Sequence, residues 1–163
     1  MRTKKDLDAE FAALYREHGQ TVFRLCMLYL GSAAKAEDAA QETFYKAYKG
    51  LHGFRRRSDA GTWLTRIAIN TCKDVLRRVE PLPIAELSSE PAYTEERDTG
   101  LSLSAAVSRL SPKLREAVIL HYYRGLELKE AARILGISAA AAAKRLERAR
   151  TELRQLLGED FYE

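Results

Sequence analysis

Apolar residues recur every three or four positions along most of the 163-residue chain, which is the spacing of one face of an α-helix. Glycines interrupt this periodicity and suit helix ends, because glycine readily adopts the left-handed backbone that closes a helix. No segment alternates apolar and polar residues as a strand would. The pattern therefore predicts an all-α protein with helices over 5–18, 21–30, 34–49, 62–79, 102–110, 112–124, 127–135 and 139–157.

The periodicity is lost between residues 80 and 104. Three of the chain's four prolines lie in this segment, which has six acidic residues and one basic residue. Such a composition opposes helix formation and favours an extended chain. We therefore expect two small helical domains, residues 1–79 and 105–163, joined by an acidic flexible linker over 80–104.

Charge is distributed unevenly along the chain. The net charge of +4 is too small to indicate a nucleic-acid partner, but residues 1–79 carry 15 basic and 9 acidic residues and residues 105–163 carry 11 and 8. Two basic lobes thus flank an acidic strip. No apolar stretch approaches the ~18 residues of a membrane span, and the first residues lack the apolar segment of a signal peptide. We expect a cytoplasmic protein that does not insert directly into a membrane.

The sequence offers few residues in patterns that would support catalysis or metal binding. Cys26 and Cys72 stand alone, without a second Cys or a His at ligand spacing, which predicts reduced thiols in the core. The sequence shows no nucleophile beside a base and no glycine loop for phosphate. We expect no catalytic residue, no metal site, no cofactor and no small-molecule substrate.

The C-terminal lobe has the spacing of a helix-turn-helix. Ala132, Gly136 and Ala142 stand four and then six residues apart, which suits two helices that meet closely across a tight turn. In the second helix, capped by Ser138, a buried stripe is predicted at Ala142, Leu146, Ala149, Leu153 and Leu156. Outside this stripe lie Lys144, Arg145 and Arg148, as on a helix that enters the major groove of DNA. An alanine-rich helix that simply faces solvent is the alternative.

In the N-terminal lobe, the segment 36–51 has a second, acidic face. Asp38, Gln41, Glu42 and Tyr45 stand at i, i+3, i+4 and i+7, opposite apolar positions. Three interpretations are open: a divalent metal site on Asp38 and Glu42, a solvated salt bridge from Glu42 to Lys46, or a surface that docks another protein.

The next helix carries a basic stripe. Arg66, Asn70, Lys73 and Arg77 share one polar face, and Phe54 and Trp63 lie near its start. Cations follow a phosphate backbone, aromatic rings stack on bases and an amide binds a base edge, so the combination suits single-stranded or opened DNA. The alternatives are that Trp63 is a core residue and that Asn70 is merely exposed.

Three segments in this order resemble the extracytoplasmic-function (ECF) sigma factors of bacterial RNA polymerase. They are "AEDAAQETFYKAY" (36–48), "TWLTRIAINTCKDVLRR" (62–78) and "LSPKLREAVILHYYRGLELKEAARILGISAAAAAKRLERARTEL" (110–153), and the resemblance covers nearly the whole chain. It implies that residues 1–79 form sigma region 2, that 80–104 form the linker, which follows a path in the polymerase close to that of nascent RNA, and that 105–163 form sigma region 4.

The resemblance also implies three groups of site residues. Core RNA polymerase would be bound through its beta-prime clamp and beta subunits, and the residues that dock on the clamp would be Asp38, Gln41, Glu42, Tyr45 and Tyr48. Those that bind the promoter −10 element would be Phe54, Arg55, Arg56, Trp63, Arg66, Asn70, Lys73 and Arg77. Those that bind the −35 element would be Ser138, Ala140, Ala141, Lys144, Arg145, Arg148 and Arg150.

The resemblance further implies an inhibitory anti-sigma factor as a partner, often held at the membrane, and a place on the nucleoid when the chain is bound to polymerase. The chain departs from the family pattern at Glu127, where Ser or Thr is usual, and at Ala140, Ala141 and Ala143, where larger residues are common. These departures leave open how the −35 element is read, by side chains or by backbone and shape. Two other functions stay possible on the residues alone: a free-standing helix-turn-helix regulator, and a metal-dependent nuclease built on Asp38 and Glu42.

Overall fold

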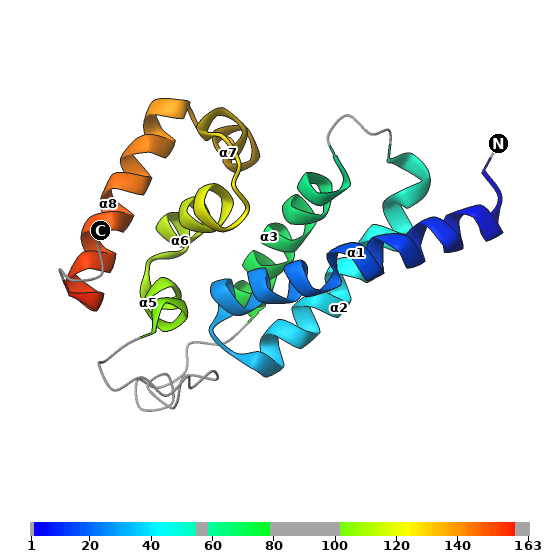
Figure 1. The fold of residues 1–163 in the computed structure, drawn as a ribbon, viewed down its shortest axis with the longest axis horizontal. Coiled ribbons are helices and arrows are strands. Elements are labelled where there is room, and N and C mark those ends of the chain that lie inside the picture. Colours follow the sequence, from blue (N-terminus) through cyan, green and yellow to red (C-terminus); the bar gives the residue numbers. More distant parts are fainter. Residues whose placement is uncertain (1, 55–58, 79–101, 159–163) are drawn as a thin grey trace.

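The computed structural model describes residues 2–54, 59–78 and 102–158, and every element in these ranges is helical. The elements are α1 (Lys4–Leu30), α2 (Ala33–Gly50), the 3₁₀ turn η1 (Leu51–Gly53), α3 (Ala60–Arg78), α5 (Leu103–Arg109), α6 (Pro112–Val118), the π-helical turn η2 (Ile119–Tyr123), α7 (Leu128–Leu135) and α8 (Ala139–Leu157) (Figure 1). The all-α prediction is confirmed. The predicted linker lies outside the described residues except for its last three, where Ser102 caps α5.

Helices α1, α2 and α3 pack together as the first bundle. The predicted break near Gly19 is wrong, because α1 runs through it without interruption from a capping box at Thr3 and Asp6. Gly19 has an ordinary helical backbone, whereas Gly31 ends the helix in the left-handed conformation with φ 70°. The buried face of α1 continues on both sides of Gly19 through Leu14 and Val22, so packing outweighs the low helix propensity of one glycine.

The second bundle consists of α5, α6, η2, α7 and α8. The single helix expected over 112–124 is instead α6 followed by a π turn, in which Arg124 N donates to Ile119 O at 2.9 Å. Pro112 occupies the first turn of α6, a position that suits proline because the first N–H groups of a helix have no partner within it. Between α7 and α8, Gly136 adopts φ 72° and closes α7, which confirms the predicted turn.

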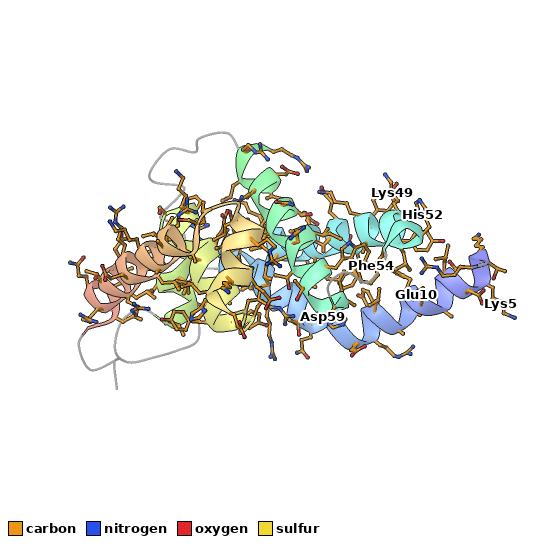
Figure 2. The ribbon with its side chains drawn as sticks, turned by 90° about the horizontal axis from the view of Figure 1, so that it is seen from above. Lys5, Glu10, Lys49, His52, Phe54 and Asp59 are labelled. Atoms are coloured by element: carbon orange, nitrogen blue, oxygen red, sulfur yellow. The ribbon has the colours of Figure 1, made fainter. Side chains whose placement is uncertain are left out.

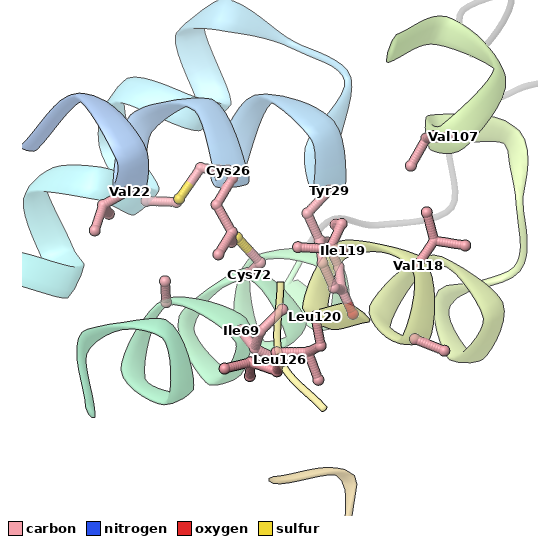
Figure 3. Packing of buried hydrophobic residues seen from close by; sticks show 14 of the residues in the cluster. Val22, Cys26, Tyr29, Ile69, Cys72, Val107, Val118, Ile119, Leu120 and Leu126 are labelled. Atoms are coloured by element: carbon pink, nitrogen blue, oxygen red, sulfur yellow. The ribbon is translucent and has the colours of Figure 1, made fainter. Parts of the chain in front are cut away.

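The two bundles share one continuous apolar core. Tyr29 near the end of α1 is fully buried, and Val107, Val118 and Ile119 of the second bundle belong to the same cluster (Figure 3). Contacts between α1 and α5, η2 and α6 join the bundles, so their relative placement is defined by packing.

Two surface features complete the fold. An open, mainly apolar groove of about 870 Å³ lies between the bundles and is lined by Phe23, Met27, Leu103, Tyr122 and Leu153, among other residues. Charged side chains project from both bundles (Figure 2). Phe54 and Asp59, which are labelled there, flank residues 55–58, which precede α3 and are not described. Within the described ranges, no helix combines the length and apolar character needed to cross a bilayer.

We predict opposite effects for alanine at the two glycines of α1. Gly31→Ala should lower the free energy of unfolding by about 1–3 kcal/mol, because φ 70° strains a side chain and the new Cβ would lie 3.0 Å from Ser108 Cβ. Gly19→Ala should raise it by about 0.4–1 kcal/mol, because its Cβ would meet only Tyr15 at ordinary contact distance in a continuous helix. Urea unfolding measures both, and a shift of both variants in the same direction would contradict the assignment.

Candidate functional site

The structure brings the predicted acidic and aromatic residues onto one face of α2. Ala36, Phe44 and Ala47 on the opposite face are buried in the first bundle, so the helix has only one orientation that satisfies its apolar side. On the outward face, here named the α2 surface, four side chains are exposed and Glu42 is partly buried; its members are Asp38, Gln41, Glu42, Tyr45 and Tyr48.

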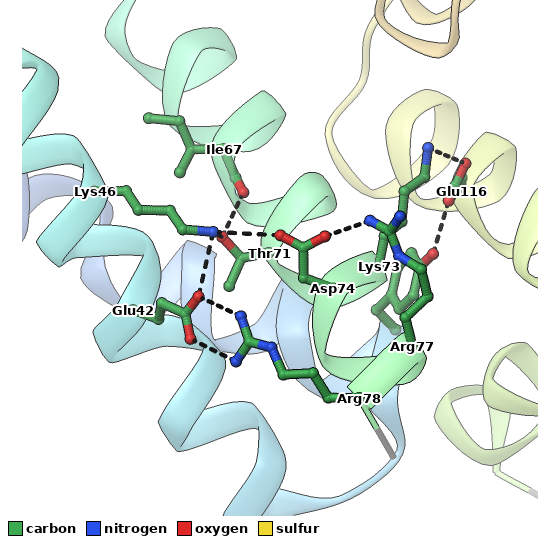
Figure 4. Close-up of polar contacts among 10 residues, drawn as sticks. Glu42, Lys46, Ile67, Thr71, Lys73, Asp74, Arg77, Arg78 and Glu116 are labelled. Carbon is green, nitrogen blue, oxygen red and sulfur yellow. Dashed lines mark hydrogen bonds and ion pairs between the residues drawn. The ribbon is translucent and has the colours of Figure 1, made fainter. Parts of the chain in front are cut away.

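Glu42 differs from the rest of the α2 surface because it is held by cations. Lys46 Nζ lies 3.2 Å from its carboxylate, as the sequence spacing had suggested. Arg78, 36 residues away on α3, adds a two-pronged contact at 3.1 and 3.3 Å (Figure 4). The hydrogen bond from Arg78, supported by Lys46, lowers the pKa of the Glu42 carboxyl. Glu42 therefore fixes α2 against α3.

The charge contacts continue along α3. Lys46 also donates to Thr71 Oγ1 at 3.1 Å and lies 3.6 Å from Asp74, which in turn pairs with Arg77 (Figure 4). Charges of alternating sign thus connect the α2 surface to the basic stripe of α3.

Aromatic rings border the α2 surface. Tyr45 is 61% exposed, and the Lys49 ammonium lies 4.8 Å from its ring centre. Tyr48 donates its hydroxyl to Asp8 at 2.8 Å, and this bond raises the pKa of the Tyr48 phenol. Tyr15 of α1, which sequence reasoning missed, is 57% exposed and packs at 5.0 Å against Phe44. Exposed tyrosines beside an acidic patch are typical of protein-binding surfaces.

The polar residues that form the predicted stripe on α3, here named the α3 stripe, are Arg66, Asn70, Lys73 and Arg77, of which three are basic. Arg66, Asn70 and Arg77 are exposed, which agrees with the predicted polar face. Lys73 is only partly exposed, because its Nζ lies 3.4 Å from Glu116 of α6. The structure therefore places three members of the stripe in solvent and turns the fourth toward the second bundle.

Phe54 and Trp63 lie at the start of the α3 stripe and stack on each other. Their ring centres are 4.4 Å apart with an interplanar angle of 19°, and both residues are partly buried. Asp59 caps this end of α3 by accepting a hydrogen bond from Thr62 N at 2.8 Å, and this bond lowers the pKa of its carboxyl. Arg55 and Arg56 lie outside the described residues.

Helix α8 presents the predicted third surface. Ser138 caps it by accepting from Ala141 N at 3.0 Å, and Ala142, Leu146, Ala149 and Leu153 are buried, as predicted. Leu156, the last member of the predicted buried stripe, is only partly buried, because it lies in the final turn of the helix. Five of the predicted −35 residues face outward: Ala140, Lys144 and Arg148 are exposed, and Ala141 and Arg145 are partly exposed. Glu127 makes no side-chain cap on α7, so the first helix of the motif relies on packing.

Arg150 is not brought together with Lys144, Arg145 and Arg148, the other basic residues predicted to bind the −35 element. It accompanies Leu153 along the groove between the bundles, and its guanidinium donates to Tyr122 Oη at 2.6 Å. Two residues beyond Arg148, the helix has turned by about 200°, so the two side chains leave it on different sides.

Among the described residues, no three His, Cys, Asp or Glu side chains gather as metal ligands would. Asp38 and Glu42 share the α2 surface, but Glu42 is already bound by Lys46 and Arg78. Cys26 and Cys72 are buried free thiols that lie together in the core (Figure 3), and their contact together with burial raises the pKa of Cys72.

Comparison with known proteins assigns the chain to a family. The sequence matches the model for sigma-70 region 2 over residues 14–80 and the model for sigma-70 region 4 over residues 100–153. It is 33% identical over 153 residues to the ECF RNA polymerase sigma factor SigM of Mycobacterium tuberculosis, covering 91% of this chain and 77% of the relative. The chain belongs to the ECF sigma factors of RNA polymerase. SigW of Bacillus subtilis, another member, is 30% identical over 94% of this chain and 91% of its own length.

Solved structures agree with this family assignment. The fold is similar to RpoE in complex with the anti-sigma factor NepR from Bartonella quintana, with a TM-score of 0.71, 26% identity, and coverage of 91% of this chain and 96% of that one. It is also similar to CnrH in complex with the cytosolic domain of CnrY, with a TM-score of 0.69, 27% identity, and coverage of 94% and 90%. In this ECF sigma factor, the α2 surface and the α3 stripe fall within the region 2 match, and α8 falls within the region 4 match through residue 153.

We predict a pH-dependent contribution of Glu42 to stability. At pH 7, Glu42→Gln should lower the free energy of unfolding by roughly 0.5–1 kcal/mol, a modest value because Arg78 is largely exposed and solvent screens the pair. The folded-state pKa of Glu42 is lowered, so the contribution is complete above the ordinary glutamate pKa of about 4.3 and is lost as the pH falls through the folded value.

Urea unfolding of the wild type and of Glu42→Gln between neutral and acidic pH measures this difference. Glu37→Gln removes an exposed carboxylate from the same helix and should change stability by less than about 0.5 kcal/mol at any pH. An effect of Glu42→Gln that stays constant down to acidic pH would show that the ion pairs do not account for it.

Proposed function

We propose that this ECF sigma factor binds core RNA polymerase through the α2 surface and directs it to promoters. The α3 stripe binds the −10 element and α8 binds the −35 element. One observation carries this proposal: a single chain of this family exposes an acidic, aromatic surface and two separate basic surfaces on three helices. The chain acts as a non-catalytic subunit, and the polymerase supplies the chemistry of RNA synthesis.

The α2 surface supports docking because its central residues are free to meet a partner. Asp38 and Gln41 are exposed, and Tyr45 and Tyr48 supply large rings beside them. Charges on such a surface steer association and set its register, while the rings supply contact area. Glu42 contributes differently, since its bonds to Arg78 and Lys46 hold α2 in place for docking.

The α3 stripe supports binding to an opened −10 element. Asn70 exposes an amide able to pair with a base edge, and Arg66 one turn earlier can meet the phosphate backbone. The stacked rings of Phe54 and Trp63 form an aromatic surface at the start of the stripe, against which an unstacked base can pack. Arg55 and Arg56, which follow Phe54 in the sequence, would add cations to this binding surface.

For the −35 element, α8 offers a narrow N-terminal half and cations beyond it. Ala140 and Ala141 leave room for close approach to the major groove, and Lys144 and Arg148 are exposed for phosphates or guanine edges. Small side chains form few base-specific hydrogen bonds, so this helix depends strongly on backbone contacts and DNA shape.

An anti-sigma factor is proposed as a further partner. RpoE and CnrH, which resemble this chain over 91% and 94% of its length, were solved in complexes, the first with an anti-sigma factor. Such a partner would keep the chain from the polymerase until a signal releases it. The chain would act in the cytoplasm, on the nucleoid with polymerase or beside the membrane with a tethered partner.

We predict that Asp38→Lys combined with Gln41→Ala weakens binding to core polymerase by at least tenfold, or about 1.4 kcal/mol. These two side chains are exposed, so the fold should survive, whereas Glu42→Lys would also break the contacts to Lys46 and Arg78. Glu17→Lys on α1 makes a matched charge reversal at an exposed carboxylate. Fluorescence titration against core polymerase measures the affinities. Unchanged binding by the double variant would contradict the proposal that α2 docks on the polymerase.

We predict that Asn70→Ala reduces promoter opening by about tenfold, within the 1–3 kcal/mol of a good amide-to-base contact, while affinity for core polymerase is retained. Permanganate reactivity of unpaired thymines in the promoter measures opening. Gln155→Ala, which removes an exposed amide from α8, is the control. Loss of core binding by Asn70→Ala would instead identify Asn70 as a structural residue.

A further inference from the structure

The 3₁₀ turn η1 connects α2 to the aromatic surface of Phe54 and Trp63. Phe54 N donates to Leu51 O at 3.1 Å, and the backbone then leaves the turn in an extended conformation. Leu51 is fully buried, which holds the turn from the inside. Two of the four residues from Gly50 to Gly53 are glycines, and a 3₁₀ turn has poorer hydrogen-bond geometry than an α-helix. The turn therefore needs further contacts to keep one path.

The segment 50–54 contacts Trp63 at two points. The Phe54 ring stacks on the Trp63 ring with 4.4 Å between their centres. The backbone of Gly50 also lies close to the indole, so that a Cβ at Gly50 would be 3.6 Å from Trp63 Cζ2. Because both contacts come from this short segment, a change in its path moves the aromatic surface at the start of α3.

Arg2 connects η1 to the first turns of α1. Its Nη2 donates to Leu51 O at 3.2 Å and to His52 O at 3.1 Å, and its Nη1 donates to Glu10 at 2.8 Å. Glu10 and His52 are labelled in Figure 2. Leu51 O thus accepts from both Phe54 N and Arg2. The last carbonyls of a helix lack donors within it and form its negative end, so an arginine held by a carboxylate is a suitable partner for them.

The contact from Arg2 fixes geometry more than it adds stability. The Arg2 side chain is 40% exposed, and His52 is exposed as well. Water can replace the guanidinium at such carbonyls, so its loss leaves few groups unpaired and lowers the free energy of unfolding only slightly. Water molecules do not tie the turn to α1, however. Without Arg2, the turn keeps its hydrogen bonds and loses its fixed position.

We propose that Arg2, held by Glu10, is a positioning residue for promoter opening. It fixes η1 and, through η1, the stacked rings of Phe54 and Trp63 against which an unstacked base packs. Arg2 itself does not contact the base. Its role in opening rests on the proposed −10 function of this aromatic surface.

The first experiment uses Trp63, the single tryptophan of the chain, as a fluorescent reporter in the free full-length protein. Phe54→Ala defines the emission of Trp63 without its stacked ring. We expect Arg2→Met, which keeps an unbranched side chain but lacks the guanidinium, to shift the emission to longer wavelength and to increase quenching by acrylamide, in both cases toward the values of Phe54→Ala. Lys5→Met removes the same charge from an exposed position on α1 and should change neither.

A double-mutant cycle tests whether Glu10 acts through Arg2. Glu10→Gln should shift the emission in the same direction as Arg2→Met and by a smaller amount, because the carbonyl contacts remain. Glu10→Gln combined with Arg2→Met should match Arg2→Met alone. Additive shifts would show that the two residues act separately and would overturn the role given to Glu10.

The second experiment measures promoter opening with core polymerase, by permanganate reactivity. Arg2→Met should reduce opening by roughly 3- to 10-fold, the range of one net hydrogen-bond contribution, with unchanged affinity for core polymerase. Arg2→Lys should restore opening only in part, because a compact ammonium cannot bond two carbonyls and a carboxylate as a planar guanidinium does. Lys5→Met should open the promoter as the wild type does.

A merely structural role gives a different result. Circular dichroism would then show a lower melting temperature for Arg2→Met, while the Trp63 emission of the folded variant would equal that of the wild type, and this outcome overturns the proposal. Wild-type opening by Arg2→Met, where Phe54→Ala reduces opening, overturns it as well. Normal opening by Phe54→Ala would refute the proposed −10 role of the aromatic surface, whereas the fluorescence would still decide whether Arg2 holds the turn.

Discussion

Two neighbouring charges on α6, Arg115 and Glu116, are buried where the bundles meet, and the arrangement of the chain depends on how they are paired. Arg115 donates to the carbonyls of Tyr29, Ser108 and Leu110 and lies 5.3 Å from the Tyr29 ring centre. Glu116 accepts from Tyr29 Oη. Because an unpaired buried charge is far more costly than a paired one, the end of α1 and the start of α6 can meet in only a narrow range of positions.

A second set of charges sets the orientation of α2 relative to α3 in the first bundle. Glu42 and Lys46 of α2 meet Thr71, Asp74 and Arg78 of α3, so the proposed polymerase-docking surface and the proposed −10 surface are held in one relation to each other. Each pair is partly exposed and contributes little alone. Their combined effect is on orientation, so a promoter bound by α3 would have a defined position relative to a polymerase bound at α2.

In α8 of the second bundle, the residues that stabilise the fold differ from those proposed to contact DNA. The buried side of α8 uses Ala142, Leu146, Ala149 and Leu153, while its caps, Ser138 and Gly158, and its alanines stabilise the helix locally. Its outward side is therefore free to vary without loss of the fold. Arg150 lies on a different side of α8: it donates to Tyr122 and lines the groove beside α1, so it is not part of the proposed DNA surface.

The sequence by itself determined the helices, their inward faces, the turn at Gly136 and the outward position of Asp38, Gln41, Arg66 and Asn70, because periodicity and helix caps act within one or two turns. It misplaced a break at Gly19, where packing on both sides carries α1 through. Only the tertiary structure decided that Glu42 meets Arg78, that Arg124 meets Thr65 and that Lys73 meets Glu116. These partners lie 36 to 59 residues apart, and no local pattern encodes which buried or half-buried charge a side chain will meet once helices pack.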